Sequence, residues 1–324
     1  MTRAIVMREP GGPEVLRVEH VDVGDPAPTQ VRLRHTAVGV NFHDIYVRSG
    51  LYKTLPLPGI PGLESVGIVE AVGQRVDSVA VGDRVGCLSL GYGAYAERRL
   101  ADADTLIALP DSIDDRTAAA TLLRGLTARM LVHDVHRLGP GMTVLVHAAA
   151  GGVGRLVCQW ARELGATVIG TVGSEAKARS ARASGCEHVV LYRTEDFVAR
   201  VRAITGGSGV DVAYDSVGRD TFMGSMACLA PLGHLVNFGQ SSGPVEPIPM
   251  SLLFQKSNSV TRPNVFHYIA DPVRRDAMAA ALFDALTAGV LTPGAIHAYP
   301  FEEVGRAQRD MAERATAGAV ILTF

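Results

Sequence analysis

The segment from residue 143 to 154, Thr-Val-Leu-Val-His-Ala-Ala-Ala-Gly-Gly-Val-Gly, constrains the fold of this chain more than any other. A strand-like run, Thr143–His147, leads into a cluster of tiny residues, and a helix pattern begins at once. The apolar residues of that pattern recur at i, i+3, i+4, i+7, i+8 and i+11: Val153, Leu156, Val157, Trp160, Ala161 and Leu164. Gly165 follows where a helix C-cap glycine is expected. The segment therefore predicts a strand, a tight turn and a helix.

The small residues of this turn matter because a pyrophosphate can approach a backbone closely only where no Cβ intervenes. The N-terminus of the following helix adds free N–H groups and the positive end of its dipole. The pattern Ala149-x-Gly151-x-x-Gly154 is the dinucleotide-binding fingerprint with alanine in the first glycine position. A glycine triplet alone also suits a plain strand–helix connection. The apolar strand pattern at Thr167–Thr171 favours dinucleotide binding.

From about residue 143 the chain alternates strand and helix patterns. The expected strands are Thr143–His147, Thr167–Thr171, His188–Tyr192, Val210–Tyr214, His234–Phe238 and Ser259–Thr261. The expected helices between them include Glu175–Ala183, Glu195–Ile204 and Asp220–Leu229. Six strands with intervening helices predict an α/β fold with a doubly wound parallel sheet, a Rossmann domain over residues 125–263.

The rest of the chain has a different pattern. In the first 120 residues or so, short runs such as Val31–Arg34, Val66–Val72 and Arg84–Cys87 lie between Gly and Pro clusters, which predicts an all-β, turn-rich region. The last residues contain a helical stretch, Asp276–Ala288, and short strand and helix patterns. They are too few to fold alone, so we expect residues 264–324 to complete the domain formed by residues 1–124.

Composition excludes several classes of function. The formal net charge of −2 gives no electrostatic basis for binding nucleic acid or an anionic membrane surface. The N-terminus lacks a signal-peptide pattern, and no apolar run is long enough to span a membrane, so we expect a cytoplasmic protein. The four cysteines are widely spaced without a Cys-x-x-Cys pair, which argues against a structural zinc site and a disulfide framework.

Motifs spread in order along the chain carry a resemblance to a known family. They are Asn41–Tyr52, Pro61–Gly67, Gly93–Tyr95, Ala148–Gly154, Tyr214–Gly218 and Val260–Pro263. With them the chain resembles the medium-chain dehydrogenase/reductase superfamily, and more closely its zinc-independent quinone oxidoreductase branch, the relatives of ζ-crystallin. The resemblance implies a GroES-like, β-rich catalytic domain beside the Rossmann domain. It also implies NADPH as the cofactor, a quinone as the substrate and a homodimer.

The same residues bear on metal chemistry. Zinc-dependent members of the superfamily place a cysteine near Asn41, a histidine at the position of Leu63, and a four-cysteine lobe after the region Val81–Cys87. An asparagine and a leucine cannot supply the three or four ligands that zinc needs. His43 beside Asp44 is the nearest approach to a ligand pair, and we expect no metal site there or elsewhere.

The end of the second Rossmann strand points to the form of the cofactor. NAD-selective sites place an acidic residue there for the ribose 2′-hydroxyl, whereas this chain has Gly173, Ser174 and, one helical turn later, Lys177. Ser174 can donate a hydrogen bond to a 2′-phosphate and Lys177 supplies a positive charge. Glu175 points the other way, but the first turn of a helix readily carries a solvent-facing Glu. In the family, this pattern together with a tyrosine matching Tyr192 goes with NADPH.

The resemblance also implies further site residues. Asn41, Tyr46 and Thr127 would lie near the nicotinamide, with Gly152 and Val153 near the pyrophosphate. Four residues at or just after the carboxyl ends of sheet strands would contact the cofactor: Ser216, Phe238, Gly239 and Ser241. Arg262 and Arg314 resemble late arginines that close on the cofactor, although each also suits a surface salt bridge.

No nucleophile set or dedicated carboxylate pair is evident, so cofactor and acceptor supply most of the chemistry. We expect the chain to orient NADPH and a conjugated carbonyl face to face in an interdomain cleft. Tyr46 and Tyr52 are the candidate catalytic donors or stacking groups, with Asn41 as a further polar contact. Two alternatives stay open: an NADPH-dependent 2-alkenal or enone reductase, and a non-catalytic NADPH-binding protein of crystallin or RNA-binding type.

Overall fold

The computed structural model describes all residues, 1–324, and the chain forms two compact units. The β-rich unit comprises Met1–Leu123, Ala279–Phe283 and Pro293–Phe324, and the α/β unit comprises Arg124–Met278 and Asp284–Thr292. The domain boundaries predicted from the sequence, after residues 124 and 263, stay a prediction.

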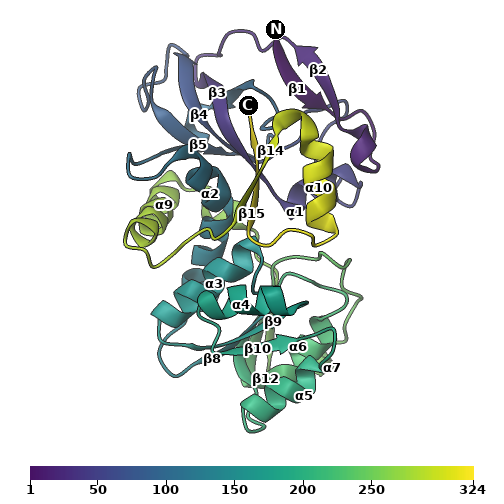
Figure 1. The fold of residues 1–324 in the computed structure, drawn as a ribbon. Coiled ribbons are helices and arrows are strands. Elements are labelled where there is room, and N and C mark those ends of the chain that lie inside the picture. Colours follow the sequence, from purple (N-terminus) through teal and green to yellow (C-terminus); the bar gives the residue numbers. More distant parts are fainter. The chain divides into compact units, whose positions relative to one another are not determined.

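A six-stranded sheet forms the centre of the α/β unit (Figure 1). Its strands are β8 (Thr143–Val146), β9 (Thr167–Val172), β10 (His188–Leu191), β11 (Val210–Asp215), β12 (Leu229–Asn237) and β13 (Ser259–Thr261). All neighbouring pairs are parallel, in the order β10-β9-β8-β11-β12-β13. This order reverses between β8 and β11, and the carboxyl ends of strands at such a switch point are where open α/β sheets bind ligands.

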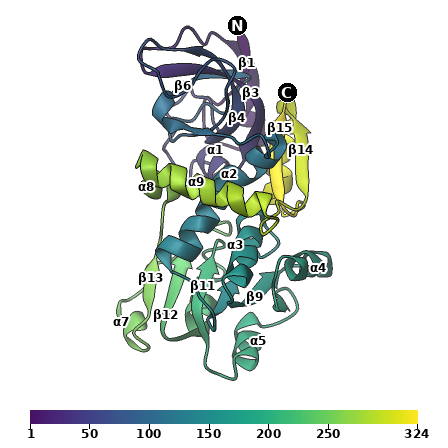
Figure 2. The ribbon, with the colours of Figure 1, turned by 90° about the vertical axis from the view of Figure 1, so that its left-hand side faces the viewer.

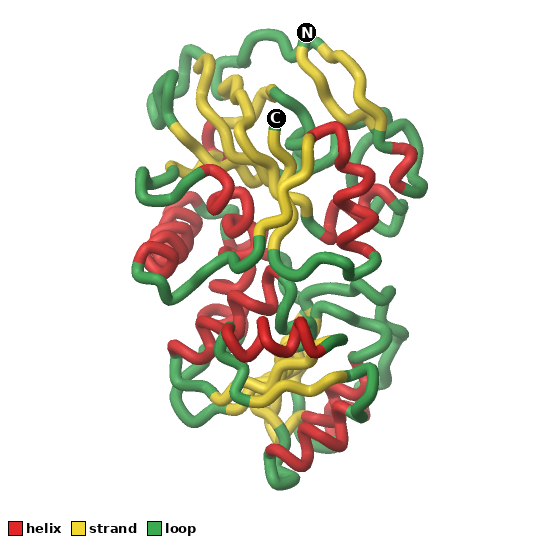
Figure 3. The backbone as a smooth tube through the Cα atoms, in the orientation of Figure 1, coloured by secondary structure: helices red, strands yellow, loops and turns green.

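Helices pack on both faces of this sheet (Figure 3). Those that contact its strands are α3 (Gly152–Glu163), α4 (Glu175–Ala183), α5 (Phe197–Ile204) and α6 (Phe222–Cys228), and two leucines of α7 (Ser251–Phe254) pack against the same core. The unit also contains α8 (Val265–Tyr268) and a π-helical segment, Met130–Val135. Apolar strand residues such as Leu145, Ile169 and Leu235 are fully buried beneath Phe222 and Met226 of α6. Burial of one such side chain contributes about 1.5–3 kcal/mol. The parallel strands can therefore be apolar on both faces, as the sequence runs required.

The β-rich unit is built on a seven-stranded sheet. Its strands are β3 (Gln30–Val40), β4 (Glu64–Val72), β5 (Arg84–Leu88), β6 (Arg98–Asp102), β7 (Leu106–Ala108), β14 (Ile296–Pro300) and β15 (Ala319–Thr323), and a separate antiparallel pair consists of β1 (Thr2–Val6) and β2 (Arg17–Val21). The C-terminal strand β15 pairs antiparallel with β3, so the last strand of the chain joins a sheet that is otherwise formed mainly by strands of the first 108 residues (Figure 2).

Four α-helices complete the chain: α1 (Phe42–Arg48), α2 (Asp115–Arg129), α9 (Pro272–Thr287) and α10 (Val304–Ala312). Short 3-10 turns lie at Pro13–Val15, Ala103–Thr105 and Phe301–Glu303. The core of the β-rich unit joins strands to α10, with Ile5, Tyr95, Phe301 and Val320 at most 1% exposed. No helix of the structure combines the length and apolar character that a membrane span needs.

The predicted fold class is confirmed, and two elements match to the residue, α4 and β13. The expectation that the first 120 residues are all-β was wrong, because α1 lies within them. The reason is local: Asn41 occupies the N-cap, and its backbone N–H donates to the Asp44 carboxylate at 2.8 Å in a capping box. Such a reciprocal cap stabilises a helix too short for its periodicity to be recognised.

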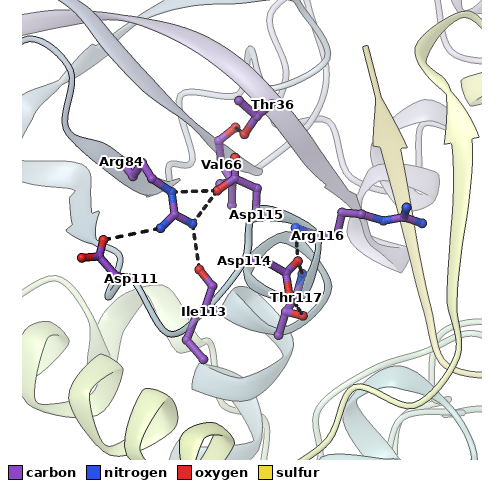
Figure 4. A network of polar contacts seen from close by, with 9 residues as sticks. All are labelled: Thr36, Val66, Arg84, Asp111, Ile113, Asp114, Asp115, Arg116 and Thr117. Atoms are coloured by element: carbon purple, nitrogen blue, oxygen red, sulfur yellow. Dashed lines mark hydrogen bonds and ion pairs between the residues drawn. The ribbon is translucent and has the colours of Figure 1, made fainter.

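Polar contacts also fix the start of α2, as Figure 4 shows. The carboxylate of Asp114 accepts the backbone N–H groups of Arg116 and Thr117 at 3.0 and 2.9 Å, which satisfies N–H groups that a helix start leaves free. Arg84 of β5 donates hydrogen bonds to the Asp115 carboxylate at 2.6 Å and to the Ile113 carbonyl at 2.7 Å. The sheet therefore holds the start of α2.

Candidate active site

The glycine turn lies directly after β8, at the switch point of the parallel sheet. Ala148 adopts φ of +50°, a left-handed conformation uncommon for a residue with a Cβ, and its carbonyl accepts the Gly151 N–H at 2.8 Å. Gly151 is extended and caps α3. The chain thus reverses in four residues and directs the first N–H groups of α3 toward the carboxyl edge of the sheet, the arrangement that binds an anion.

Gly154 shows why the third glycine of the fingerprint is needed. A Cβ built there would lie 2.4 Å from the Ala148 carbonyl oxygen and 3.0 Å from its carbon, both backbone atoms that cannot turn aside. At Gly151 the corresponding distance to the same oxygen is 3.1 Å. The helix packs so closely on the turn that only glycine fits, and the resulting cradle suits a dinucleotide pyrophosphate.

A buried polar network lies beneath the turn. The His147 ring contacts Thr171 Oγ1 through Nδ1 and Ser225 Oγ through Nε2, both at 2.9 Å. Ser225 in turn donates to Asp215 at 3.1 Å, and Asp215 accepts the N–H groups of Val217 and Gly218 at 2.8 and 3.0 Å. Burial lowers the pKa of His147, which favours the neutral ring between two hydroxyls. The turns after β8 and β11 are therefore held by one network.

The residues predicted to hold a 2′-phosphate lie together after β9. Ser174 caps α4 and its Oγ accepts the Lys177 N–H at 3.4 Å, which leaves the hydroxyl proton free to be donated elsewhere. Gly173 precedes it, and a Cβ there would lie 2.8 Å from the Tyr192 hydroxyl. Glu175 is exposed. The structure thus brings Gly173, Ser174, Lys177 and Tyr192 to one corner of the α/β unit.

Other predicted cofactor residues follow β11, β12 and β13. Ser216 accepts the Ser241 N–H through its carbonyl at 3.2 Å, which joins the turns after β11 and β12. Arg262, just after β13, donates to the side chain of Asn237 and to the Gly239 carbonyl at 3.4 Å. Phe238 and Gly239 are half-buried beside them. Arg262 thus bonds neutral groups at the strand ends, and its expected contact with the cofactor stays a prediction.

The remaining predicted residues are placed as follows. Gly152 and Val153 form the first turn of α3, and Thr127 is half-buried on α2. Arg314 belongs to the β-rich unit, is exposed just after α10, and has φ of +61°. Asn41, Tyr46 and Tyr52 also belong to the β-rich unit.

Asn41 belongs to a cluster of buried polar side chains at the start of α1. Its amide nitrogen donates to the Glu64 carboxylate at 2.9 Å, and the other oxygen of Glu64 accepts the Leu123 N–H at 2.8 Å. Tyr95 donates its hydroxyl to Asp44 at 2.9 Å. Asp44 and Glu64 are fully buried. Buried carboxylates persist only when such donors replace water.

This cluster does not fit a zinc ion. Leu63, 1% exposed, has no donor atom, and the Asn41 amide is engaged as a hydrogen-bond donor to Glu64. No three His, Cys, Asp or Glu side chains of the chain gather as a metal site requires.

A group of rings and hydroxyls, the aromatic cluster, lies next to Asn41 and consists of His43, Tyr46, Tyr52 and Tyr92. The Tyr46 and Tyr52 rings pack edge to face at 5.2 Å between centroids, and His43 packs against Tyr52 in the same way at 5.2 Å. His43 Nε2 lies 3.0 Å from the Tyr92 hydroxyl, which also bonds Thr54 Oγ1. Edge-to-face packing orders these rings without closing their faces.

From the sequence, His43 was considered only as a metal ligand and rejected in that role, and Tyr92 was not considered as a functional candidate. Burial lowers the pKa of His43 to about 4, so the ring is neutral at pH 7. Burial also raises the pKa of Tyr92, partly offset by the Thr54 hydrogen bond. Tyr92 has φ of +58°, strain that costs roughly 1–3 kcal/mol and is often retained at functional sites. A tyrosine between two glycines, at Gly91-Tyr92-Gly93, was the one signal in the sequence.

Comparison with known proteins places both units in one family. Residues 27–111 match the family model described as the alcohol dehydrogenase GroES-like domain, and residues 152–281 match the model described as zinc-binding dehydrogenase. A quinone oxidoreductase from Pseudomonas aeruginosa is 43% identical over 326 residues, with 99% of each chain covered. The chain belongs to the quinone oxidoreductases of the medium-chain dehydrogenase/reductase superfamily.

Two further relatives of this quinone oxidoreductase family member have names that state a cofactor or an activity. The crystal structure of Escherichia coli quinone oxidoreductase complexed with NADPH matches with a TM-score of 0.97 and 41% identity, covering 100% of both chains. A protein named 2-haloacrylate reductase, from a Burkholderia species, is 44% identical over 329 residues and 99% of each chain. The family resemblance predicted from the sequence is confirmed.

Proposed function

We propose that this chain is an NADPH:quinone oxidoreductase. The observation that carries the proposal is the Gly154 cradle followed by Ser174 and Lys177, a dinucleotide turn whose next strand ends without an acidic side chain. The named activity of the Pseudomonas relative supports a quinone as acceptor, and the NADPH in the Escherichia coli enzyme supports the cofactor.

The α/β unit would bind the cofactor through residues at the carboxyl edge of its sheet. Backbone N–H groups at Gly152 and Val153 would bind the pyrophosphate, while Ser174 would donate its hydroxyl and Lys177 would supply its charge to the 2′-phosphate. Further proposed contacts follow β11 to β13, namely Ser216, Phe238, Gly239, Ser241 and Arg262, with Thr127 and Tyr192 from the same unit. Arg314 belongs to the β-rich unit, and its contact with the cofactor stays a prediction from the family resemblance. When bound, NADPH supplies a hydride.

The aromatic cluster of the β-rich unit would bind the acceptor. Tyr46 and Tyr52 offer ring faces and hydroxyls to a planar conjugated carbonyl, and Asn41 is held in place by Glu64. Donors already oriented toward the acceptor oxygen stabilise the negative charge that develops there, without reorganisation at the moment of transfer. We assign no metal to this step, because Leu63 and Asn41 provide no ligand set.

A second candidate is reduction of a conjugated C=C bond, which the Burkholderia relative's name favours. A haloacrylate carries a carboxylate, whereas the aromatic cluster consists of an imidazole that is neutral at pH 7 and three tyrosine side chains. A neutral quinone suits such a site better than an anion does.

Stopped-flow oxidation of NADPH tests both proposals, with 1,4-benzoquinone, a 2-alkenal and 2-chloroacrylate as separate acceptors. Turnover of the quinone, with the other two slower by at least tenfold, is the expected result. Faster turnover of chloroacrylate or the alkenal would establish the second candidate, and tight NADPH binding without any turnover would overturn both.

We also propose that the protein forms a homodimer. Strand β13 is the open edge of the six-stranded sheet, and a nearby apolar side chain, Phe254, is 85% exposed while Met250 is 76% exposed. An open strand edge with exposed apolar neighbours is a site for pairing with a second copy. Light scattering of the wild type should give twice the monomer mass, and Phe254→Glu should give the monomer; a monomeric wild type refutes this.

We propose a cytoplasmic location on the basis of the four cysteines, all free and buried. Cys158 and Cys186 lie with their sulfurs 3.4 Å apart and remain thiols, as is typical of a reducing compartment. Cell fractionation with a periplasmic marker tests this, and recovery with that marker would contradict it.

A further inference from the structure

Reduction of a quinone consumes a proton as well as a hydride, and the structure contains a chain of exchangeable hydrogens that ends in the aromatic cluster. The Thr54 hydroxyl is exposed and bonds the hydroxyl of Tyr92, which is 5% exposed. Tyr92 bonds His43 Nε2 at 3.0 Å. The three groups connect solvent to a half-buried imidazole that packs against Tyr52.

We propose that His43 is the proton donor of the reaction and that Tyr92 and Thr54 resupply it from solvent. This rests on the proposed quinone reductase function. His43 is the catalytic residue, because its second ring nitrogen, Nδ1, is the atom that would meet the acceptor. Tyr92 and Thr54 act through His43 and are positioning residues.

The proton transfers balance as follows. Hydride transfer converts the quinone to the hydroquinone anion, and Nδ1–H of His43 gives its proton to that oxygen. Nε2 takes the Tyr92 proton, Tyr92 takes the Thr54 proton, and Thr54 takes one from a solvent water, which leaves a hydroxide ion that the bulk solvent neutralises. The imidazole stays neutral throughout and only changes tautomer. It returns to the Nδ1–H form by exchange with water after the product leaves.

The backbone at Tyr92 supports a role beyond packing. A residue with a Cβ is held at φ of +58°, and the strained peptide is fixed by Arg99, whose Nη1 donates to the Tyr92 carbonyl at 2.6 Å. Arg99 is itself 6% exposed. Glycine would relieve the strain, as it does at the neighbouring Gly93, where φ is +91°. The chain keeps a tyrosine whose hydroxyl the relay requires.

A neutral relay also fits the surroundings of His43. Burial holds its pKa at about 4, so a protonated imidazole is scarce at pH 7 and would not be the donor. A neutral ring that donates at one nitrogen while accepting at the other needs no charged state in the buried cluster.

The experiment measures kcat with 1,4-benzoquinone in H2O and D2O for the wild type, His43→Ala and Tyr92→Phe, with NADPH affinity determined separately. Both variants should lose about 10² or more in kcat, the usual contribution of a general acid, with unchanged Kd for NADPH. Added imidazole should restore much of the activity of His43→Ala and none of that of Tyr92→Phe. A solvent isotope effect present in the wild type should change in Tyr92→Phe.

Tyr299→Phe is the matched control, because Tyr299 lies on β14, outside the aromatic cluster. The variant removes only a hydroxyl that donates to Asp310 at 2.8 Å. It should leave kcat and the isotope effect unchanged. If His43→Ala and Tyr92→Phe both turn over quinone at the wild-type rate with the wild-type isotope effect, the relay is wrong. A wild type that does not turn over quinone refutes the proposed function instead.

Discussion

Replacing Gly154 with alanine tests the dinucleotide site sharply, because two physical effects predict opposite signs. Gly154 lies in the first turn of α3, where helix propensity alone predicts that alanine stabilises the fold by about 1 kcal/mol. The added Cβ, however, would meet the Ala148 carbonyl oxygen at 2.4 Å. Ordinary contacts are about 3.5 Å, so the helix or the turn must move by roughly 1 Å.

That shift has a cost in stability and a larger one in binding. Overpacking of this kind costs about 1–3 kcal/mol, which cancels the propensity gain and leaves the variant up to ~2 kcal/mol less stable. The N–H groups that we propose bind the pyrophosphate move with the helix. Loss of one charge-assisted hydrogen bond, about 1.5–3 kcal/mol, raises the Kd for NADPH by roughly 10- to 100-fold.

A graded series isolates the clash from the general effect of removing a glycine. At Gly139 a Cβ would meet nothing within 4 Å, and at Gly151 it would lie 3.1 Å from the same carbonyl oxygen that Gly154 faces. Titration of NADPH by fluorescence and thermal melts should rank the alanine variants in the order Gly139, Gly151, Gly154, from no effect to the largest. Gly154→Ala that binds NADPH as the wild type does and melts higher would refute the close-packing argument.

Three further predictions concern the cofactor, pH and the buried carboxylate. Ser174→Asp keeps the N-cap of α4 but places a carboxylate at the proposed 2′-phosphate position. The ratio of kcat/KM for NADPH to that for NADH should therefore fall by tenfold or more. An unchanged ratio excludes this corner as the 2′-phosphate site. His35 is fully buried and burial lowers its pKa to about 3, so the unfolded chain alone takes up a proton below about pH 6.5 and stability falls as the pH drops. Denaturant melts at pH 7 and 5 should show a loss of about 2 kcal/mol that His35→Asn lacks, and equal pH slopes would contradict this. Glu64→Ala leaves the Asn41 amide without its acceptor and should lower the free energy of unfolding by about 2–4 kcal/mol. Glu302→Ala, at an exposed ion pair, should change that free energy little. Equal free energies of unfolding for the two variants would show that Glu64 does not stabilise the fold.

How much of this molecule could be predicted depended on the distance over which each signal acts. The glycine turn, helix α4 and the strands β8 to β13 are specified by residues within one helical turn or one strand of each other, and the prediction from sequence agrees with the structure there, except that β12 begins at Leu229 and not at His234. The contact of Arg48 with Gln308 joins residues 260 positions apart, and the sequence contains no local signal for it. Helix α1 lay between these cases, since Asn41 and Asp44 are three residues apart but the helix they cap is only seven residues long.

His43 shows how an adjacent residue can mislead. Beside Asp44 it resembles half of a metal-binding pair, but consecutive residues on a helix do not face each other. Asp44 points to the Asn41 N–H and the Tyr95 hydroxyl, while His43 points to Tyr92 and Tyr52. The Tyr92 hydroxyl that lies 3.0 Å from His43 Nε2 is 49 residues away in the sequence, and the backbone at Tyr92 is left-handed. Residues with a Cβ rarely adopt that conformation. The pair that we propose moves the proton, His43 and Tyr92, therefore depends on a backbone conformation that local sequence preferences disfavour.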